Sequence, residues 1–168
     1  MRILKNLIFS AVFVFSAISH LPVQAIETGQ VAPEFSLPGV SADMKLSDFK
    51  GKLVYLDFWA SWCGPCKKSF PWMNAMQSTY GAQDFKIIAI NLDANTEDGK
   101  HFLSSVPANF DIAFDAKGLV PRLYQVKGMP SSFLIGRDGK ILMQHTGFNE
   151  TSGAKLELEI ATFIKRKQ

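Results

Sequence analysis

One stretch near the middle of the chain joins a buried strand to two cysteines and then to a helix. Residues 53–59 are almost continuously apolar with one acid, Asp57, which is typical of a strand buried on both faces of a sheet. Residues 67–80 carry apolar side chains at helical spacing. Cys63 and Cys66 fall between the two segments. The sequence therefore predicts that this pair lies where a strand ends and a helix begins.

The position of Cys63 favours a reactive thiolate. The first N–H groups of a helix have no partner within the helix, and the helix dipole is positive there. Both lower the pKa of a thiol, which is otherwise about 8.5. Cys66, three residues on, shares the helix face of Cys63, and Pro65 suits a first turn. We expect Cys63 to be the nucleophile and Cys66 the resolving thiol in thiol–disulfide exchange.

The small number of cysteines argues against a scaffold or a metal site. The sequence has two cysteines, three positions apart, and a disulfide between them closes a ring too small to add much stability. Zinc usually needs four protein ligands, and His101 and His145 stand in no ligand-like spacing. We therefore expect no metal here.

Composition and charge bound the class of protein. Of 168 residues, 47% are hydrophobic and 20% charged, which suits one packed domain. The net charge of +3 includes Arg2 and Lys5, and without them 16 basic residues stand against 15 acidic ones. This balance argues against nucleic acid as a partner.

The first residues are typical of an export signal. A basic start precedes a largely apolar run at 7–18, and a small-residue cleavage pattern ends at Ala25. We predict a signal peptide at 1–25, a single domain at 26–168 and a location in the periplasm or another extracytoplasmic space. The alternative is a retained membrane anchor, but a span normally needs about 20 apolar residues. After cleavage we expect no stable membrane span.

The remaining elements alternate between strands and helices. A hairpin is expected around Asp138-Gly139, joining strands at 132–135 and 141–145. This order predicts an α/β layer structure with added antiparallel strands. The other predicted elements are strands at 86–92 and 110–114 and helices at 96–106, 119–124 and 151–167.

Two residues keep two interpretations each. Asp57 either lies at an edge or in solvent, or it is a desolvated acid with a raised pKa that exchanges protons with Cys66. Pro130 follows Met129 ahead of the hairpin, where a proline simply starts an edge strand or forms a cis bond.

Several segments carry a resemblance to a known family. Residues 57–67, Asp-Phe-Trp-Ala-Ser-Trp-Cys-Gly-Pro-Cys-Lys, resemble the active-site segment of thioredoxins, and residues 128–135 resemble their cis-proline loop. Other parts resemble the exported TlpA/ResA-like branch of the thioredoxin-like superfamily, namely residues 29–37, 46–52 and 67–71 and an apparent helix–strand insertion at 96–115.

The resemblance implies a fold and a setting. The fold is a thioredoxin fold, in which a central mixed sheet is flanked by helices, with an N-terminal extension and the helix–strand insertion. The implied activity needs no bound cofactor. Such proteins act on protein thiols and disulfides, often in cytochrome c maturation, and a transmembrane thiol electron donor recharges them. The resemblance also implies that Pro130 is cis, that Met129 and Pro130 touch the substrate, and that Asp57 is the buried acid.

We therefore expect an exported enzyme, a thiol-disulfide oxidoreductase that reduces protein disulfides through Cys63 and Cys66. Trp62, Gly64 and Pro65 complete the predicted substrate-binding set with Met129 and Pro130, although core packing is a simpler interpretation of Trp62. The dipeptide Gly64-Pro65 is that of thioredoxins and favours a reducing couple. The alternatives are a periplasmic oxidase or isomerase, because the periplasm is oxidising, and more distantly a thiol peroxidase or a metal-delivery module.

Overall fold

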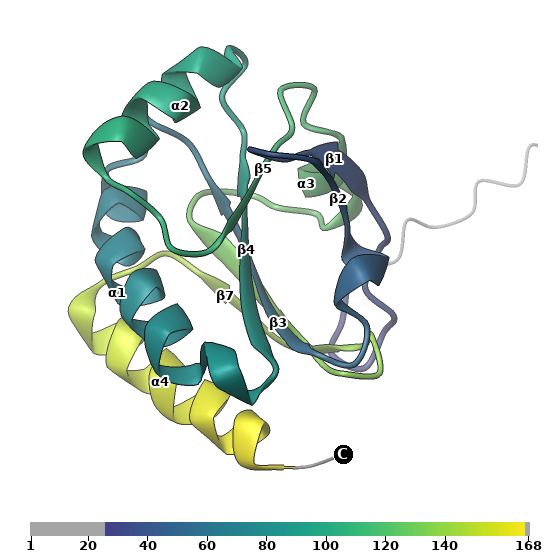
Figure 1. Cartoon of the computed structure of the whole chain (residues 1–168). Coiled ribbons are helices and arrows are strands. Elements are labelled where there is room, and N and C mark those ends of the chain that lie inside the picture. The colour runs from purple at the N-terminus through teal and green to yellow at the C-terminus, as the bar shows by residue number, and fades with distance from the viewer. Residues whose placement is uncertain (1–25, 167–168) are drawn as a thin grey trace, which may run out of the picture.

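Residues 26–166 are the part of the chain that the computed structural model describes, and a five-stranded mixed sheet forms their centre (Figure 1). The strand order is β5-β4-β3-β6-β7. The first three are mutually parallel, whereas β6 runs antiparallel to β3 and β7 antiparallel to β6. The strands are β3 (Leu53–Trp59), β4 (Phe85–Asn91), β5 (Asp111–Phe114), β6 (Ser131–Ile135) and β7 (Ile141–Thr146).

Helices cover both faces of this sheet. One face carries α1 (Gly64–Tyr80), α2 (Thr96–Ser105) and α4 (Glu150–Lys165), of which α1 and α4 lie side by side (Figure 1). The other face carries the short α3 (Leu119–Leu123) and the N-terminal segment. Three smaller elements of that segment are β1 (Ser36–Pro38), β2 (Asp43–Lys45) and the 3-10 helix Leu46–Phe49, and a second 3-10 turn spans Gly81–Gln83.

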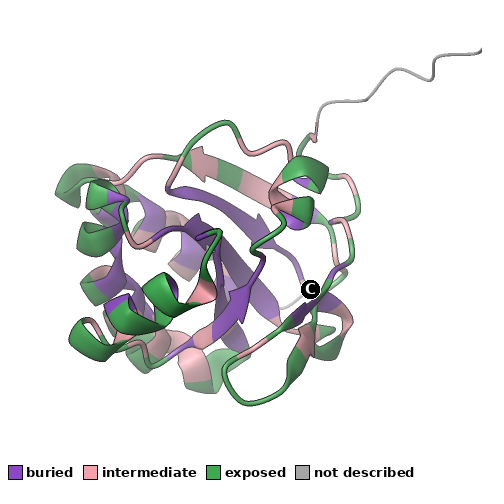
Figure 2. Cartoon of the chain, turned by 90° about the horizontal axis from the view of Figure 1, so that it is seen from above, coloured by how far each residue is buried: buried purple, intermediate pink, exposed green. Residues whose placement is uncertain are grey.

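The central strand β3 explains the two-layered core. All of its residues are buried, and successive side chains point to opposite faces. Tyr55 and Trp59 pack with α1 and α4, whereas Leu56 and Phe58 pack with α3 and the N-terminal segment. Figure 2 shows the buried strands between helices whose outer surfaces are exposed. Each face of β3 therefore contributes side chains to its own apolar cluster.

The N-terminal segment crosses the sheet from one edge to the other. At the β7 end the Gly29 N–H donates to the Ile141 carbonyl over 2.7 Å, and the Ile141 N–H donates to Gln30 over 2.8 Å. At the other end Gly39 forms an antiparallel bridge with Ala113 of β5. The resemblance implied this extension, but the hairpin β1–β2 was not predicted because strands of three residues carry no readable periodicity.

The other predicted elements are confirmed, with small shifts at their ends. β3 has the predicted bounds, and α1 begins three residues before the predicted helix, at Gly64. The predicted hairpin turn contains Gly139 at a φ of 80°, in the left-handed region that glycine accepts without strain. The predicted signal peptide and Lys167, the predicted end of the last helix, lie outside the described residues.

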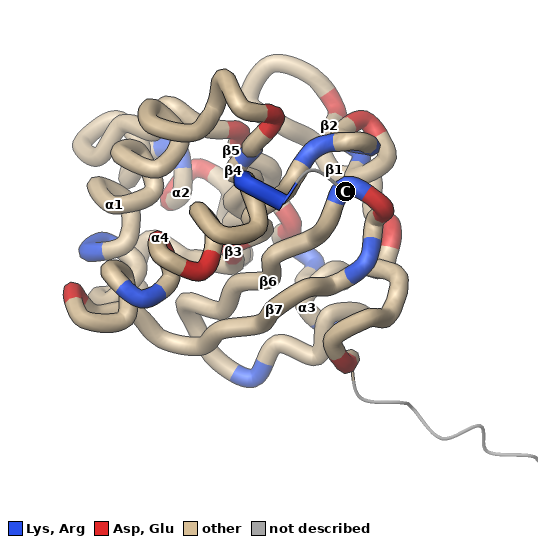
Figure 3. Tube along the Cα trace, turned by 90° about the horizontal axis from the view of Figure 1, so that it is seen from below, with Lys and Arg blue, Asp and Glu red and all other residues tan. Residues whose placement is uncertain are grey.

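The surface of the described residues carries charges of both signs. Lysine and arginine are interspersed with aspartate and glutamate around the molecule (Figure 3). Within residues 26–166, no helix has the length and apolar character needed to cross a membrane.

The packing of α4 gives a matched test of the fold. Leu156 of α4 is 2% exposed, whereas Leu158 on the same helix is 71% exposed. Replacing Leu156 with Ala should lower the free energy of unfolding by about 2–5 kcal/mol, because it removes buried carbon and leaves a cavity. Leu158→Ala, the control, should change it by less than about 0.5 kcal/mol. Urea denaturation measures both, and equal effects would contradict the described packing.

Candidate active site

The two cysteines lie at the amino end of α1, above the end of the central strand. Cys63 is the N-cap of α1, and the backbone N–H of Cys66 donates to its Sγ over 3.3 Å. The two sulfurs are joined in a disulfide. Cys63 is 5% exposed and Cys66 is fully buried, so an approaching group meets Cys63 first. The predicted placement at a junction of strand and helix is confirmed.

This cap supplies the electrostatics that a thiolate needs. When the disulfide is reduced, a negative sulfur at Cys63 faces the unpaired N–H groups and the positive dipole end of α1. Pro65 lies in the first turn of that helix, where it removes no helical hydrogen bond. A Cβ at Gly64 would meet no atom within 4 Å, so the outside of the turn beside Cys63 is open. The arrangement therefore stabilises one of the two thiolates, that of Cys63.

Asp93 and Asn91 hold the turn before Cys63, and they were not predicted. The buried Asp93 carboxylate accepts from the Ser61 N–H over 2.9 Å and from the Ser61 hydroxyl over 3.0 Å. It also accepts from the Asn91 side-chain amide over 2.7 Å. Gly99 lets α2 approach, because a Cβ there would lie 2.7 Å from the Asn91 side chain. The sequence could have indicated both residues, because Asn91 ends the buried parallel strand β4 and Asp93 follows it, and sites usually form at that end of such strands.

Asp57 is a buried acid on the cysteine side of the sheet. It lies in the central strand β3 and is 1% exposed, so the edge or solvent-exposed interpretation is wrong. By alternation it shares the face of Tyr55 and Trp59, whose cluster contains both cysteines. Its Oδ2 has no hydrogen-bond partner among the described residues. Burial raises the pKa of this carboxyl well above its ordinary value of 3.8.

The loop before β6 closes the site on the other side. The Met129–Pro130 peptide bond is cis, as the resemblance implied, and this excludes the simpler edge-strand interpretation, since β6 pairs on both sides. The Pro130 carbonyl accepts from the Gly147 N–H over 2.8 Å, and the Ser131 hydroxyl donates to Gly128 over 2.7 Å. Met129 is half-buried against the cluster that contains the cysteines.

The surface around the disulfide has an exposed ring and a hollow. Trp62 is 71% exposed, so the core-packing interpretation of this residue is wrong. Beside it, a hollow of about 440 Å³ lies between the cysteine turn and α2. Its lining combines an apolar floor with polar and charged groups: Ser61, Lys67, Asp98, His101, Phe102, Ser105 and Val106.

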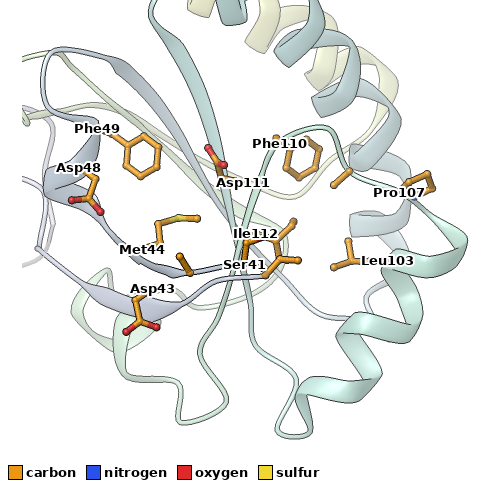
Figure 4. Close-up of a pocket in the computed structure, with 13 residues that line it drawn as sticks. Ser41, Asp43, Met44, Asp48, Phe49, Leu103, Pro107, Phe110, Asp111 and Ile112 are labelled. Atoms are coloured by element: carbon orange, nitrogen blue, oxygen red, sulfur yellow. The ribbon is translucent and has the colours of Figure 1, made fainter.

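A second cleft lies at the β5 edge, away from this turn. It has a volume of about 590 Å³ and runs between the hairpin β1–β2 and β5 (Figure 4). Apolar side chains such as Met44, Phe49 and Phe110 line it together with the carboxylates Asp48 and Asp111. None of these residues is among those predicted for the thiol chemistry.

Known proteins are similar to this chain in sequence and in fold. The model of the AhpC/TSA family matches residues 28–144. The thiol-disulfide oxidoreductase ResA of Bacillus thuringiensis subsp. konkukian is 36% identical over 144 residues, which cover 85% of this chain and 80% of ResA. ResA of Bacillus subtilis is 36% identical over 125 residues, which cover 74% of this chain and 70% of that protein.

Solved structures agree with these relatives. A Chlorobium tepidum protein proposed to be thiol:disulfide interchange protein DsbE is 56% identical, with a TM-score of 0.82 over 83% of this chain and 99% of that one. StoA from Bacillus subtilis is 26% identical, with a TM-score of 0.65 over 76% of this chain and 96% of its own. The predicted family and the thioredoxin-like fold are confirmed.

The raised pKa of Asp57 predicts a stability that depends on pH. Between the ordinary value of 3.8 and the raised folded value, the folded chain binds a proton that the unfolded chain has lost. The wild type therefore loses stability as the pH rises through this window. Asp57→Asn removes that loss, so its free energy of unfolding relative to the wild type should grow by more than about 1 kcal/mol from pH 4 to pH 8.

Urea denaturation of the oxidised proteins across this pH range measures the difference. The exposed residue Asp43 supplies the control, and Asp43→Asn should follow the wild type. A constant difference between Asp57→Asn and the wild type over the whole range would contradict a raised pKa of the buried Asp57.

Proposed function

This chain belongs to the AhpC/TSA family and is a thiol-disulfide oxidoreductase, and we propose that it reduces disulfide bonds of protein substrates outside the cytoplasm. One observation carries the proposal: the Sγ of Cys63 caps α1, with Cys66 one turn inside the same helix. A thiolate at the first position attacks, and a second thiol within reach releases the product. The electrons travel in the two sulfurs, so the reaction needs no bound cofactor.

The proposed reaction has two exchanges. The Cys63 thiolate attacks one sulfur of the substrate disulfide, forms a mixed disulfide and expels the other substrate sulfur as a thiolate. Cys66 then loses its proton and attacks Cys63, which releases the second substrate sulfur. The enzyme dithiol is oxidised to the Cys63–Cys66 disulfide, the substrate disulfide is reduced to two thiolates, and one proton leaves Cys66.

Asp57 is the proposed acceptor of the Cys66 proton. The carboxyl lies on the same face of the sheet as the apolar cluster that contains Cys66. Its Oδ2 has no hydrogen-bond partner among the described residues. Burial raises its pKa well above the ordinary value of 3.8, which makes its carboxylate a stronger base than that of an exposed aspartate. A carboxyl with its ordinary pKa would be too weak a base for the buried Cys66.

The proposed substrate surface surrounds Cys63. The exposed Trp62 ring offers apolar area on one side, and the half-buried Met129 with Pro130 lies on the other. The open turn at Gly64-Pro65 leaves room for a substrate chain between them. This surface suits an extended, partly apolar peptide that carries the disulfide.

The direction and the setting are also proposals. Gly64-Pro65 is the thioredoxin dipeptide and favours a reducing couple, which in an oxidising compartment needs an electron supply such as a transmembrane thiol donor. The signal-like residues 1–25 support export. Reduction of protein disulfides for cytochrome c maturation is the proposed pathway, and the names of the ResA and DsbE relatives support the exchange chemistry itself.

Trapping the intermediate tests the two cysteine roles. Replacing Cys66 with Ser should leave the first exchange intact and block the second, so that a mixed disulfide between Cys63 and the substrate accumulates. Turnover should fall by at least roughly 10³-fold. Mass spectrometry of the chain after incubation with a disulfide-bonded protein measures the adduct. Cys63→Ser is the matched control and should give no adduct, and an adduct on Cys66 in that variant would reverse the assignment.

The reduction potential tests the direction. We expect the Cys63–Cys66 couple to lie near the value of thioredoxin, roughly −270 mV, because the dipeptide between the cysteines is the same. Equilibration of the mature chain with a thiol–disulfide redox buffer gives the value. A potential near roughly −120 mV would identify an oxidant that installs disulfides and would overturn the proposed direction.

A further inference from the structure

The proposed chemistry leaves Asp57 with a proton that has no direct way out. Its carboxyl is 1% exposed and lies in the central strand between β4 and β6. Each turnover brings one proton to this group from Cys66, so the proton has to reach solvent before the next one. The inference below rests on that proposed role of Asp57.

Strand register places two polar residues in line with Asp57. Ser132 of β6 is directly opposite Asp57, and His145 of β7 is directly opposite Ser132. Directly opposed residues of antiparallel strands share a face and lie about 5 Å apart. The row Asp57–Ser132–His145 therefore runs on the cysteine side of the sheet from its central strand to its edge strand. His145, at the end of the row, is half-buried and reaches the surface.

The hydrogen bonds in the row leave free the atoms that a proton relay would need. The Tyr55 hydroxyl donates to the Ser132 Oγ over 2.9 Å, so the Ser132 hydroxyl keeps its own hydrogen to donate. Among the described residues, Asp57 Oδ2 and His145 Nε2 are buried atoms with no hydrogen-bond partner. Free groups thus stand at both ends of a central hydroxyl that is already oriented.

A third buried atom without a hydrogen-bond partner belongs to Trp72, whose ring packs beside this row. Trp72 of α1 contacts the rings of Tyr55 and Phe148, each with centroids 5.5 Å apart, and its Nε1 has no partner among residues 26–166. Buried polar atoms in proteins nearly always pair with protein or with ordered water. Three such atoms around one row are the environment that holds a bridging water.

We propose that Ser132 and His145 form the route by which the proton of Asp57 reaches solvent. The proton that Cys66 gives to the Asp57 carboxylate passes to the Ser132 hydroxyl, which passes its own hydrogen on. The imidazole of His145 accepts at Nε2 and releases a proton from Nδ1 to solvent. No electrons move along the row, and its net effect is to return Asp57 to the carboxylate. Ser132 and His145 act through Asp57 and do not touch the substrate.

The other titratable groups near the row are few in the described part of the chain. Tyr55 faces Asp57 from the same strand, and burial raises its pKa, so it stays neutral and serves as a fixed donor. Cys63 and Cys66 lie in the same cluster from α1. Lys127 lines a hollow together with His145. His145 is therefore the group of the row that can accept a proton at one ring nitrogen and release one from the other.

The test measures how fast the mixed disulfide resolves. The reduced mature chain is mixed with a fluorescent disulfide peptide in weak buffer, and release of the second peptide thiol is followed in a single turnover. His145→Gln should slow this step several-fold, less than the roughly 100-fold that loss of a direct general base causes. Added imidazole should restore the rate. Gln144→Ala, at the exposed neighbouring position on β7, is the matched control and should change nothing.

Three further variants separate a relay from a structural role. Ser132→Ala should slow the step as His145→Gln does, and Ser132→Thr should retain the rate because it keeps the hydroxyl. In the Asp57→Asn background, His145→Gln should add no further loss, since both act on one proton. A normal rate in either His145→Gln or Ser132→Ala, or a slow rate of His145→Gln that imidazole does not restore, overturns the relay.

The same experiment distinguishes a failure of the relay from a failure of the proposed function. A wild-type chain that exchanges no disulfide with the peptide refutes the function before any variant is compared. A wild type that exchanges, with Asp57→Asn slow and His145→Gln normal, refutes the relay and leaves the function standing. If His145→Gln does not fold, Ser132→Ala and Ser132→Thr carry the comparison.

Discussion

The chemistry of this molecule depends on the junction where β3 ends and α1 begins. There the Cys66 N–H donates to the Cys63 sulfur, and the helix dipole adds its positive end. β3 is the central strand, so the junction lies over the middle of the sheet. Asp93, after the neighbouring strand, fixes the turn through Ser61. Together, β3, α1 and β4 therefore hold the Cys63 sulfur within the narrow range of positions that a reactive group requires.

The two faces of the sheet have separate roles. On the face of α3 and the N-terminal segment, β3 presents Val54, Leu56 and Phe58, and the described core there is apolar. On the face of α1, the same strand presents Asp57, and burial of its carboxyl, whose Oδ2 has no partner among the described residues, lowers stability. Such a departure from an apolar core is expected where function requires it. The N-terminal segment, which crosses the apolar face, thus stabilises a sheet whose other face is weakened for chemistry.

Local patterns in the sequence predicted what depends on neighbouring residues. The apolar run of β3, the Asp138-Gly139 turn and the helical spacing of residues 67–80 each indicate their structure within a few positions. The cis bond before Pro130 came through resemblance, because the residues themselves left two interpretations. Asp93 was missed because its partner Ser61 lies 32 positions away. A polar residue after a strand looks like any loop residue until the topology brings its partner alongside.

His145 shows why register carries information that a strand pattern lacks. In β7, Leu142 is an extra residue between the pairs Leu134–Met143 and Ile135–Ile141, so alternation along the strand is interrupted there. Without this bulge, every later side chain of β7 would face the other way. The bulge therefore puts His145 on the face of Asp57. A backbone irregularity beside the hairpin turn thus decides which polar groups surround the buried acid, which lies two strands away in the sheet.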